Sequence, residues 1–245
     1  GVSSSASVAV TTVGDEVNTG IQTIPRGVRM ARCERLDGVR MDAVNRDDKL
    51  DYDVTPTLFF EFHGSAATVE EQSRMVKALA ADNGGSEFRW ATDTEERNRL
   101  WHARHNAYYA GLALRPGSRS FTTDVCVPIS RLAECVTQTK RDLENSSLIA
   151  SLLGHVGDGN FHTMLLVDPD SAEELAEAER VNSSIVHRAL EMGGTCTGEH
   201  GVGLGKIPYM EAEHGVALNA MRRIKAAFDP DNIMNPGKVL PQSEK

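Results

Sequence analysis

The stretch "GHVGDGNFH", residues 154–162, constrains the fold more than any other segment of the chain. Asp158-Gly159 is among the strongest two-residue signals for a β-hairpin, and apolar segments rich in strand-forming residues flank it. A helix would have to hold two glycines within two turns, each costing about 1 kcal/mol relative to alanine. We therefore predict two antiparallel strands, over residues 147–156 and 161–168, joined by a tight turn.

A turn centred on Asp158-Gly159 also sets the pairing of the two strands. Counting outward from it places His155 directly opposite His162 on one face of the hairpin. Directly opposed residues have Cβ atoms ~4.5–5.5 Å apart. That spacing lets two imidazoles converge on one metal ion through bonds of about 2 Å. The alternative is a pair of half-buried histidines that only pack against each other.

A metal centre needs a further ligand, and "TGEHGVGLGK", residues 197–206, offers Glu199 and His200. The glycines of this segment let the backbone bend sharply, so that adjacent side chains can converge on one site. The segment is not a phosphate-binding P-loop, because Ile207 follows the lysine where Ser or Thr belongs. A His-His-Glu set would leave coordination positions open for a substrate.

Arg104 is predicted to lie on the apolar face of a helix. The helix begins at a capping box over residues 92–95 and continues to about residue 111. Apolar residues stand three and four positions away on both sides of the arginine. A charge in such a place needs an anionic partner. Either an acidic side chain forms a structural salt bridge with it, or the arginine grips the carboxylate of a substrate.

Strand and helix signals alternate along the rest of the chain, although residues 1–55 are hard to interpret beyond a strand near 29–37. Further strands are predicted at 57–64, 86–90, 120–128 and 195–197, and further helices at 68–83, 129–145, from Ser171 to Gly193, and at 212–228. Because the hairpin forces an antiparallel step, the fold class is predicted to be α+β. We expect a mostly antiparallel sheet with helices packed on one face, in a ferredoxin-like arrangement that is present once or duplicated.

Composition excludes several classes of function. A formal net charge of −9 without a basic stripe argues against nucleic acid as a partner. No apolar run approaches the ~18 residues of a membrane span, and no secretory signal is visible, so the protein is not expected to be secreted. The four cysteines are scattered without a CxxC pair, which argues against a structural zinc site and favours reduced thiols.

The segments "GHVGDGNFH", "TCTGEHGVGLGK" and "FDPDNIMNPGKVL" together resemble the C-terminal half of FAD-linked oxidases of the vanillyl-alcohol oxidase type. "LWHARHNAYYAGLALRPG" and "FTTDVCVPISRL" are closer to the cytochrome-linked D-lactate dehydrogenase branch, and the resemblance covers roughly residues 25–240. It implies the substrate or cap half of an FAD-dependent D-2-hydroxy acid dehydrogenase. The implied reaction is oxidation of D-lactate to pyruvate by hydride transfer to FAD.

The resemblance also implies roles for individual residues. A divalent metal, Zn or Mn, would be bound by His155, His162 and Glu199. His200 would act as the catalytic base, and Arg104 would bind the substrate carboxylate. FAD would lie near Asn160 and Asn235. The D-2-hydroxyglutarate branch has a lysine at the position of Thr122 and an asparagine at that of Met164. Their absence here favours a smaller, monocarboxylate substrate.

The FAD-binding domain of such enzymes has no counterpart in this sequence. Residues 1–55 are therefore expected to continue from a missing FAD-binding domain, and residues 56–245 to form the substrate or cap domain. The isolated chain is expected to bind FAD poorly and to be inactive. Two alternatives remain: a dehydrogenase for D-2-hydroxyglutarate or glycolate, and a detached cap domain that binds a protein.

The resemblance extends to partners and location. It implies a small 2-hydroxy acid substrate, cytochrome c as one candidate electron acceptor, and a homodimer as one option for assembly. A mitochondrial location is expected for a eukaryotic source, and a cytoplasmic or membrane-peripheral one otherwise.

Overall fold

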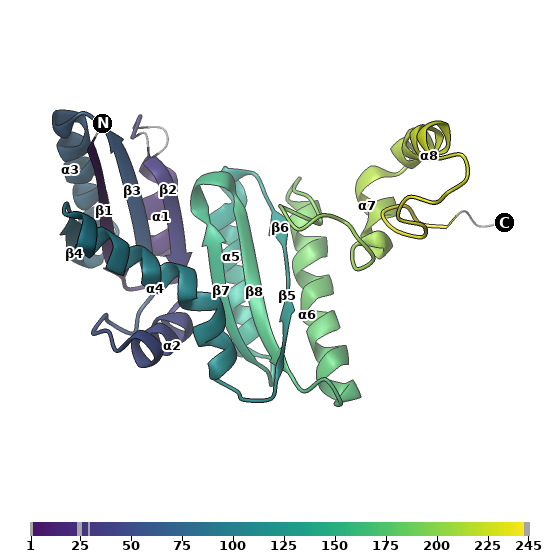
Figure 1. Cartoon of the computed structure of the whole chain (residues 1–245), viewed down its shortest axis with the longest axis horizontal. Helices are drawn as coiled ribbons and strands as arrows, with labels where there is room; N and C mark the ends of the chain where they lie inside the picture. The colour runs from purple at the N-terminus through teal and green to yellow at the C-terminus, as the bar shows by residue number, and fades with distance from the viewer. Residues whose placement is uncertain (1, 24–25, 29, 243–245) are drawn as a thin grey trace.

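In the computed structural model, residues 2–23, 26–28 and 30–242 are described. They form an eight-stranded sheet with the order β4-β1-β3-β2-β7-β8-β5, in which β6 also pairs with β8 (Figure 1). Every described pairing is antiparallel. The strands are β1 (Val2–Val10), β2 (Met30–Leu36), β3 (Thr57–Gly64), β4 (Gly85–Ala91), β5 (Arg119–Thr122), β6 (Val125–Cys126), β7 (Ile149–His155) and β8 (Asn160–Val167).

Helices connect most of these strands. They are α1 (Val13–Thr23), α2 (Gly38–Asp48), α3 (Ala66–Asp82), α4 (Thr94–Ala113), α5 (Ile129–Glu144), α6 (Ala172–Glu191), α7 (Met210–His214) and α8 (Ala217–Phe228), with short 3-10 turns η1 (Val156–Asp158) and η2 (Ile207–Tyr209). Among the described helices, none combines the length and the apolar character needed to cross a membrane. In Figure 1, α7 and α8 project beyond the end of the sheet.

The sheet consists of two ferredoxin-like units. In the first, β1 to β4 lie in the order 4-1-3-2, with α2 inserted between β2 and β3. The second repeats this order with β6, β7, β8 and, in place of a fourth strand, a single bridge between Cys126 and Thr195. Pairing of β2 with β7 joins the units. The predicted α+β class, the antiparallel sheet and the ferredoxin-like duplication are confirmed.

Two apolar cores lie on opposite faces of this sheet. Alternate residues of β3 separate them, because Phe60 belongs to one core and Phe59 to the other. Helices α1, α3, α5 and α6 cover the larger core, but the predicted packing of the helices on one face is wrong, because the opposite face is covered as well. Helices α2 and α4 cover the smaller core, and α4 crosses in front of the sheet in Figure 1. Helix α4 follows the last strand of the first unit, so the connection between the two units runs over the face of the smaller core.

Most predicted elements match the observed ones, but some differ in their extent or their ends. Residues 120–128 form two short strands rather than one, and residues 195–197 form only the bridge at Thr195. Asp93, not Thr92, caps α4, its side chain accepting a hydrogen bond from the Glu96 N–H. The predicted helix at 212–228 is interrupted at Gly215, where φ is 47°. Strand pairing also crosses the expected boundary between residues 55 and 56, because β3 lies between β1 and β2.

The β7–β8 hairpin has a longer loop than predicted. A 3-10 turn over Val156–Asp158 is followed by Gly159 in the left-handed region, at φ 75°. Residue His155 consequently pairs with Asn160, and His162 pairs with Leu153, so the predicted pairing of the two histidines is wrong. The register differs by two residues. Because side chains alternate along a strand, a shift of two keeps both histidines on the same face.

The loop geometry makes Gly159 a sensitive position. We expect Gly159→Ala to lower the free energy of unfolding by about 2–5 kcal/mol, since left-handed φ costs ~1–2 kcal/mol and overpacking ~1–3 kcal/mol. The added Cβ would lie 2.2 Å from the Val127 carbonyl oxygen. Urea denaturation measures the change. Gly157→Ala is the control, because its Cβ meets nothing within 4 Å; equal midpoints for both variants would contradict the described loop.

Candidate active site

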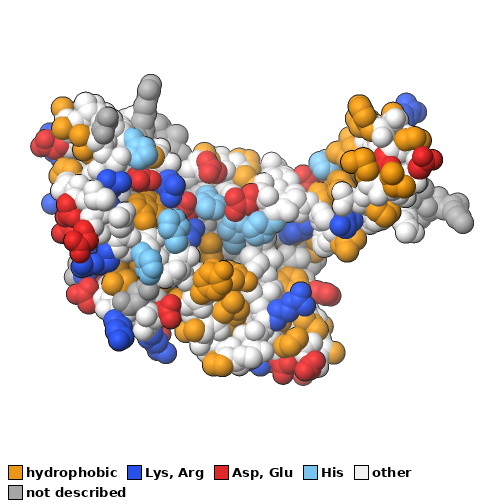
Figure 2. Space-filling model, viewed as in Figure 1, with side chains coloured by type: hydrophobic (Ala, Val, Ile, Leu, Met, Phe, Trp, Pro, Cys, Tyr) orange, Lys and Arg blue, Asp and Glu red, His pale blue; other side chains and the backbone are white. Residues whose placement is uncertain are grey.

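A cavity of about 250 Å³ lies where α4 meets the β7–β8 hairpin and the loop that contains Glu199. Figure 2 shows histidine side chains gathered near the middle of this face, with acidic and basic side chains beside them. Arg104, Ala107, Tyr108, Thr122, Leu153, His155, His162, Met164, Glu199 and His200 line the cavity. Five of the seven residues predicted to form the site are among them.

His155, His162 and Glu199 converge within this cavity. Oε1 of Glu199 lies 3.3 Å from Nε2 of His155 and 3.0 Å from Nε2 of His162. The three potential ligand atoms lie within 4.8 Å of one another. Ligands of a tetrahedral ion with bonds of about 2.0–2.1 Å are spaced about 3.3 Å apart. The donor types and spacing therefore fit a divalent metal ion.

The two histidines are held in different electrostatic environments. Burial lowers the pKa of His162 below its ordinary value, which favours the neutral imidazole that metals bind. A hydrogen bond to Glu34 raises the pKa of His155. Nδ1 of His155 lies 2.8 Å from Oε1 of Glu34, while Nδ1 of His162 lies 3.2 Å from the Thr123 carbonyl oxygen. In both residues Nε2 is the atom that faces Glu199.

Asp124, which the sequence reasoning missed, holds the Glu199 loop in place. Its Oδ2 accepts hydrogen bonds from the backbone N–H groups of Glu199 and His200, at 3.0 and 2.9 Å, and from the Thr197 hydroxyl at 2.8 Å. Burial alone would raise the pKa of Asp124, but these hydrogen bonds outweigh it and lower the pKa. Its acidic side chain within a predicted strand was the signal that could have identified it.

A second group with metal-ligand chemistry consists of Asp124, His162 and His200. Its carboxylate already accepts three hydrogen bonds from the loop. The His200 ring stacks on the His162 ring, with centroids 4.8 Å apart and planes 12° apart. Because stacked rings direct their nitrogens in parallel planes rather than toward one ion, the geometry of His155, His162 and Glu199 fits a single ion better.

Arg104 forms the internal salt bridge that the sequence analysis offered as one alternative. Its Nη2 lies 2.8 Å from Oε2 of Glu34 on β2, and the two side chains are only 14% and 12% exposed. Burial would raise the pKa of Glu34, but hydrogen bonds with His155 and Arg104 outweigh it and lower the pKa. Nε of Arg104 has no hydrogen-bond partner among the described residues. Arg104 also lines the cavity, so the residue belongs both to the salt bridge and to the cavity wall.

The two asparagines expected near FAD lie in different places. Asn160 is buried at the start of β8, and its Oδ1 has no hydrogen-bond partner in the described part of the chain. Its amide is so close to Gly198 that a Cβ there would lie 2.5 Å from Oδ1. Asn235 follows α8, accepts a hydrogen bond from the Lys238 ammonium, and does not line the cavity. Neither asparagine is therefore among the residues that line the cavity.

Comparison with known proteins identifies the family of this chain. Its residues 2–239 match the sequence profile of the FAD linked oxidases, C-terminal domain. The chain is 48% identical over 237 residues to a protein of Danio rerio named probable D-lactate dehydrogenase, mitochondrial, covering 96% of this chain and 48% of that protein. It is 46% identical to the cytochrome D-lactate dehydrogenase, mitochondrial, of Arabidopsis thaliana, covering 94% and 41%. The chain thus spans about half the length of these relatives.

More distant proteins agree on the fold. Glycolate oxidase subunit GlcD of Escherichia coli is 32% identical, over 94% of this chain and 45% of that subunit. A solved structure of 4-ethylphenol oxidase from Gulosibacter chungangensis superposes with a TM-score of 0.72 at 16% identity, over 96% of this chain and 53% of that one. That likeness shows the shared fold alone. The chain belongs to the FAD linked oxidase C-terminal domain family.

Proposed function

We propose that this chain is the substrate half of an FAD-dependent dehydrogenase that oxidises D-lactate to pyruvate. The observation that carries the proposal is the convergence of Arg104 and four metal-ligating or proton-accepting side chains on one cavity of about 250 Å³. Such a site can bind a carboxylate, hold a hydroxyl oxygen beside a metal and accept its proton. The names of the relatives from Danio rerio and Arabidopsis thaliana support the substrate.

The lining of the cavity favours a short monocarboxylate. Arg104 is the one lysine or arginine among the described residues that line it. Thr122 and Met164, which pair with each other between β5 and β8, also line the cavity, and neither side chain carries a charge. Arg40 lies behind this wall, buried, with its guanidinium hydrogen-bonded to the Ala107 carbonyl oxygen and Nη2 3.2 Å from Sδ of Met164. A second carboxylate would therefore meet a thioether rather than a cation.

The proposed chemistry assigns one task to each group. Arg104 holds the substrate carboxylate through its guanidinium. His155, His162 and Glu199 would hold a zinc or manganese ion, which, when bound, withdraws electron density from the α-hydroxyl oxygen. FAD, when bound, accepts the α-hydrogen with two electrons.

His200 takes the remaining proton in this proposal. Its Nε2 lies 3.9 Å from Oε1 of Glu199, so a hydroxyl held at the ligand set would lie near this nitrogen. The side chain is 49% exposed, which lets the imidazole pass the proton on to solvent. Loss of the hydroxyl proton and the α-hydrogen converts the alcohol carbon into the ketone of pyruvate.

The cofactor and partners follow from the same relatives. We propose that FAD is bound mainly by sequence outside this chain. Asn160, which pairs with His155 across the hairpin and has an unused buried acceptor, is the proposed contact from this chain. A cytochrome is the proposed electron acceptor, and a mitochondrial location is proposed from the names of the relatives.

Reduction of the flavin tests this function in the full-length protein. We expect D-lactate to bleach the flavin absorption under anaerobic conditions. Its kcat/KM should be at least about tenfold above those of glycolate and D-2-hydroxyglutarate, because about 1.4 kcal/mol of differential transition-state binding gives a tenfold ratio. L-Lactate is the control for stereochemistry. A preference for glycolate would favour the second candidate, a glycolate dehydrogenase, which the similarity to the Escherichia coli subunit supports. No reduction by any of these acids would overturn the proposed function.

A further inference from the structure

We propose that Glu34 is a positioning residue that fixes the metal-binding form of His155 and the orientation of Arg104 at the same time. This inference rests on the proposed function of the cavity and extends it to a residue outside the cavity lining. Glu34 lies on β2, directly across the strand pair from His155 on β7. Its two carboxylate oxygens contact one partner each, Oε1 with His155 Nδ1 and Oε2 with Arg104 Nη2, both at 2.8 Å.

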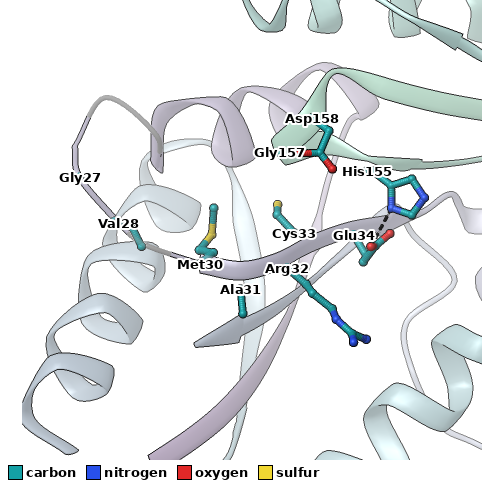
Figure 3. A pocket seen from close by; sticks show the side chains of 10 residues that line it. All are labelled: Gly27, Val28, Met30, Ala31, Arg32, Cys33, Glu34, His155, Gly157 and Asp158. Carbon is teal, nitrogen blue, oxygen red and sulfur yellow. Dashed lines mark hydrogen bonds and ion pairs between the residues drawn. The ribbon is translucent and has the colours of Figure 1, made fainter. Parts of the chain in front are cut away.

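The placement of Glu34 explains how one carboxylate can serve two partners. The β2–β7 ladder joins the two ferredoxin-like units over three residue pairs, and Glu34–His155 is the terminal pair. Arg104 comes from α4, the helix between the two units. Glu34 itself lines a neighbouring cavity of about 570 Å³ together with His155, and Figure 3 shows the contact between the two side chains. Glu34 thus contacts two residues that line the substrate cavity without lining that cavity itself.

The hydrogen bond to Glu34 determines which nitrogen of His155 can bind a metal. An ionised carboxylate only accepts hydrogen bonds, so Nδ1 of His155 must carry the proton that Glu34 accepts. In the neutral ring Nε2 then keeps its lone pair, and Nε2 is the atom that lies 3.3 Å from Oε1 of Glu199. Carboxylates behind metal-ligating histidines commonly fix the tautomer in this way, and their loss typically weakens metal binding 10- to 100-fold.

The same carboxylate restricts Arg104. With Nη2 bound to Glu34, the guanidinium plane is held in one orientation while the group still lines the cavity. An arginine without this partner would lose side-chain order and would leave a mostly buried charge unpaired. One acidic side chain therefore links the proposed metal site to the proposed carboxylate site.

The tautomer of His155, measured by ¹⁵N NMR at pH 8, tests the proposal on the chain itself. Wild type is expected to show the Nδ1–H form. In Glu34→Gln the amide N–H₂ can donate to Nδ1, so the Nε2–H form should gain population and Zn²⁺ affinity should fall about 10- to 100-fold. Glu34→Asp, which keeps the acceptor, is expected to retain the Nδ1–H form and most of the affinity.

Glu61→Gln is the matched control. Glu61 has the same 12% side-chain exposure, lies on the adjacent strand β3 and pairs with Arg32, away from the cavity lining. The Nδ1–H form and wild-type Zn²⁺ affinity in Glu34→Gln would overturn the role of Glu34 while leaving the metal site intact. Absence of Zn²⁺ binding in wild type would overturn the metal site, and the tautomer comparison would still decide whether Glu34 positions His155.

Discussion

His162→Gln is expected to weaken Zn²⁺ binding by this chain at least about 100-fold. Loss of a direct ligand should exceed the 10- to 100-fold effect typical of residues behind a ligand. The His162 side chain is 4% exposed and its Nε2 lies 3.0 Å from Oε1 of Glu199, so the substitution removes a buried nitrogen from the proposed ligand set. Competition with a chromophoric zinc chelator at pH 7.5 measures the change.

The control for this prediction is His187→Gln. His187 lies exposed on α6, hydrogen-bonded within its own helix to the Ser183 carbonyl oxygen. Its replacement removes one histidine from the chain without touching the cavity lining, so the affinity should stay within about twofold of wild type. If His162→Gln bound Zn²⁺ as tightly as His187→Gln does, the metal would be held elsewhere and the proposed ligand set would be wrong.

Arg104→Lys is expected to lower kcat/KM for D-lactate about 10²- to 10³-fold in the full-length protein. Truncating one member of a buried charge pair costs about 2–5 kcal/mol, and lysine cannot reproduce the planar fork of the guanidinium. The ammonium can still pair with Glu34, so folding should be preserved. Because the carboxylate is bound in both the ground state and the transition state, much of the loss should appear as a higher KM.

Steady-state kinetics of Arg115→Lys provide the comparison. Arg115 forms a bidentate pair with Glu174, at 2.7 and 3.0 Å, and does not line the cavity. The same chemical change there should leave kcat/KM within about twofold of wild type. Equal kinetics for both arginine variants would show that the pairing of Arg104 with Glu34 is purely structural.

The sequence predicted correctly that both histidines of the hairpin lie on one face of the sheet. An error of two residues in the predicted register does not change that face. The turn at Asp158-Gly159 predicted a two-residue loop, whereas the chain uses a 3-10 turn before Gly159. The resulting shift of two residues changed the partner of His155 but not its face of the sheet. The glycines around Glu199 likewise indicated that adjacent side chains could converge, without showing that Asp124 holds the loop.

Strand β1 and the role of Glu34 could not be predicted from the local sequence. Strand β1 reads "VSSSASVAV", yet its serines at positions 4, 5 and 7 are buried. Serine has no strong preference for strands, so the local pattern gave no signal. Tertiary packing explains one of these positions, because the Ser5 hydroxyl accepts a hydrogen bond from Nε1 of Trp101 on α4. Glu34 was missed for a related reason: its partners lie 70 and 121 residues away along the chain.

Anomalous X-ray diffraction from crystals of this chain grown with Mn²⁺ or Zn²⁺ tests the central claim most directly. We expect one strong peak bounded by Nε2 of His155, Nε2 of His162 and Oε1 of Glu199, with metal–ligand distances of about 2.0–2.2 Å. The carboxylate of added D-lactate should lie against Arg104. A peak bound to other residues, or none in this cavity at saturating metal, would contradict the account.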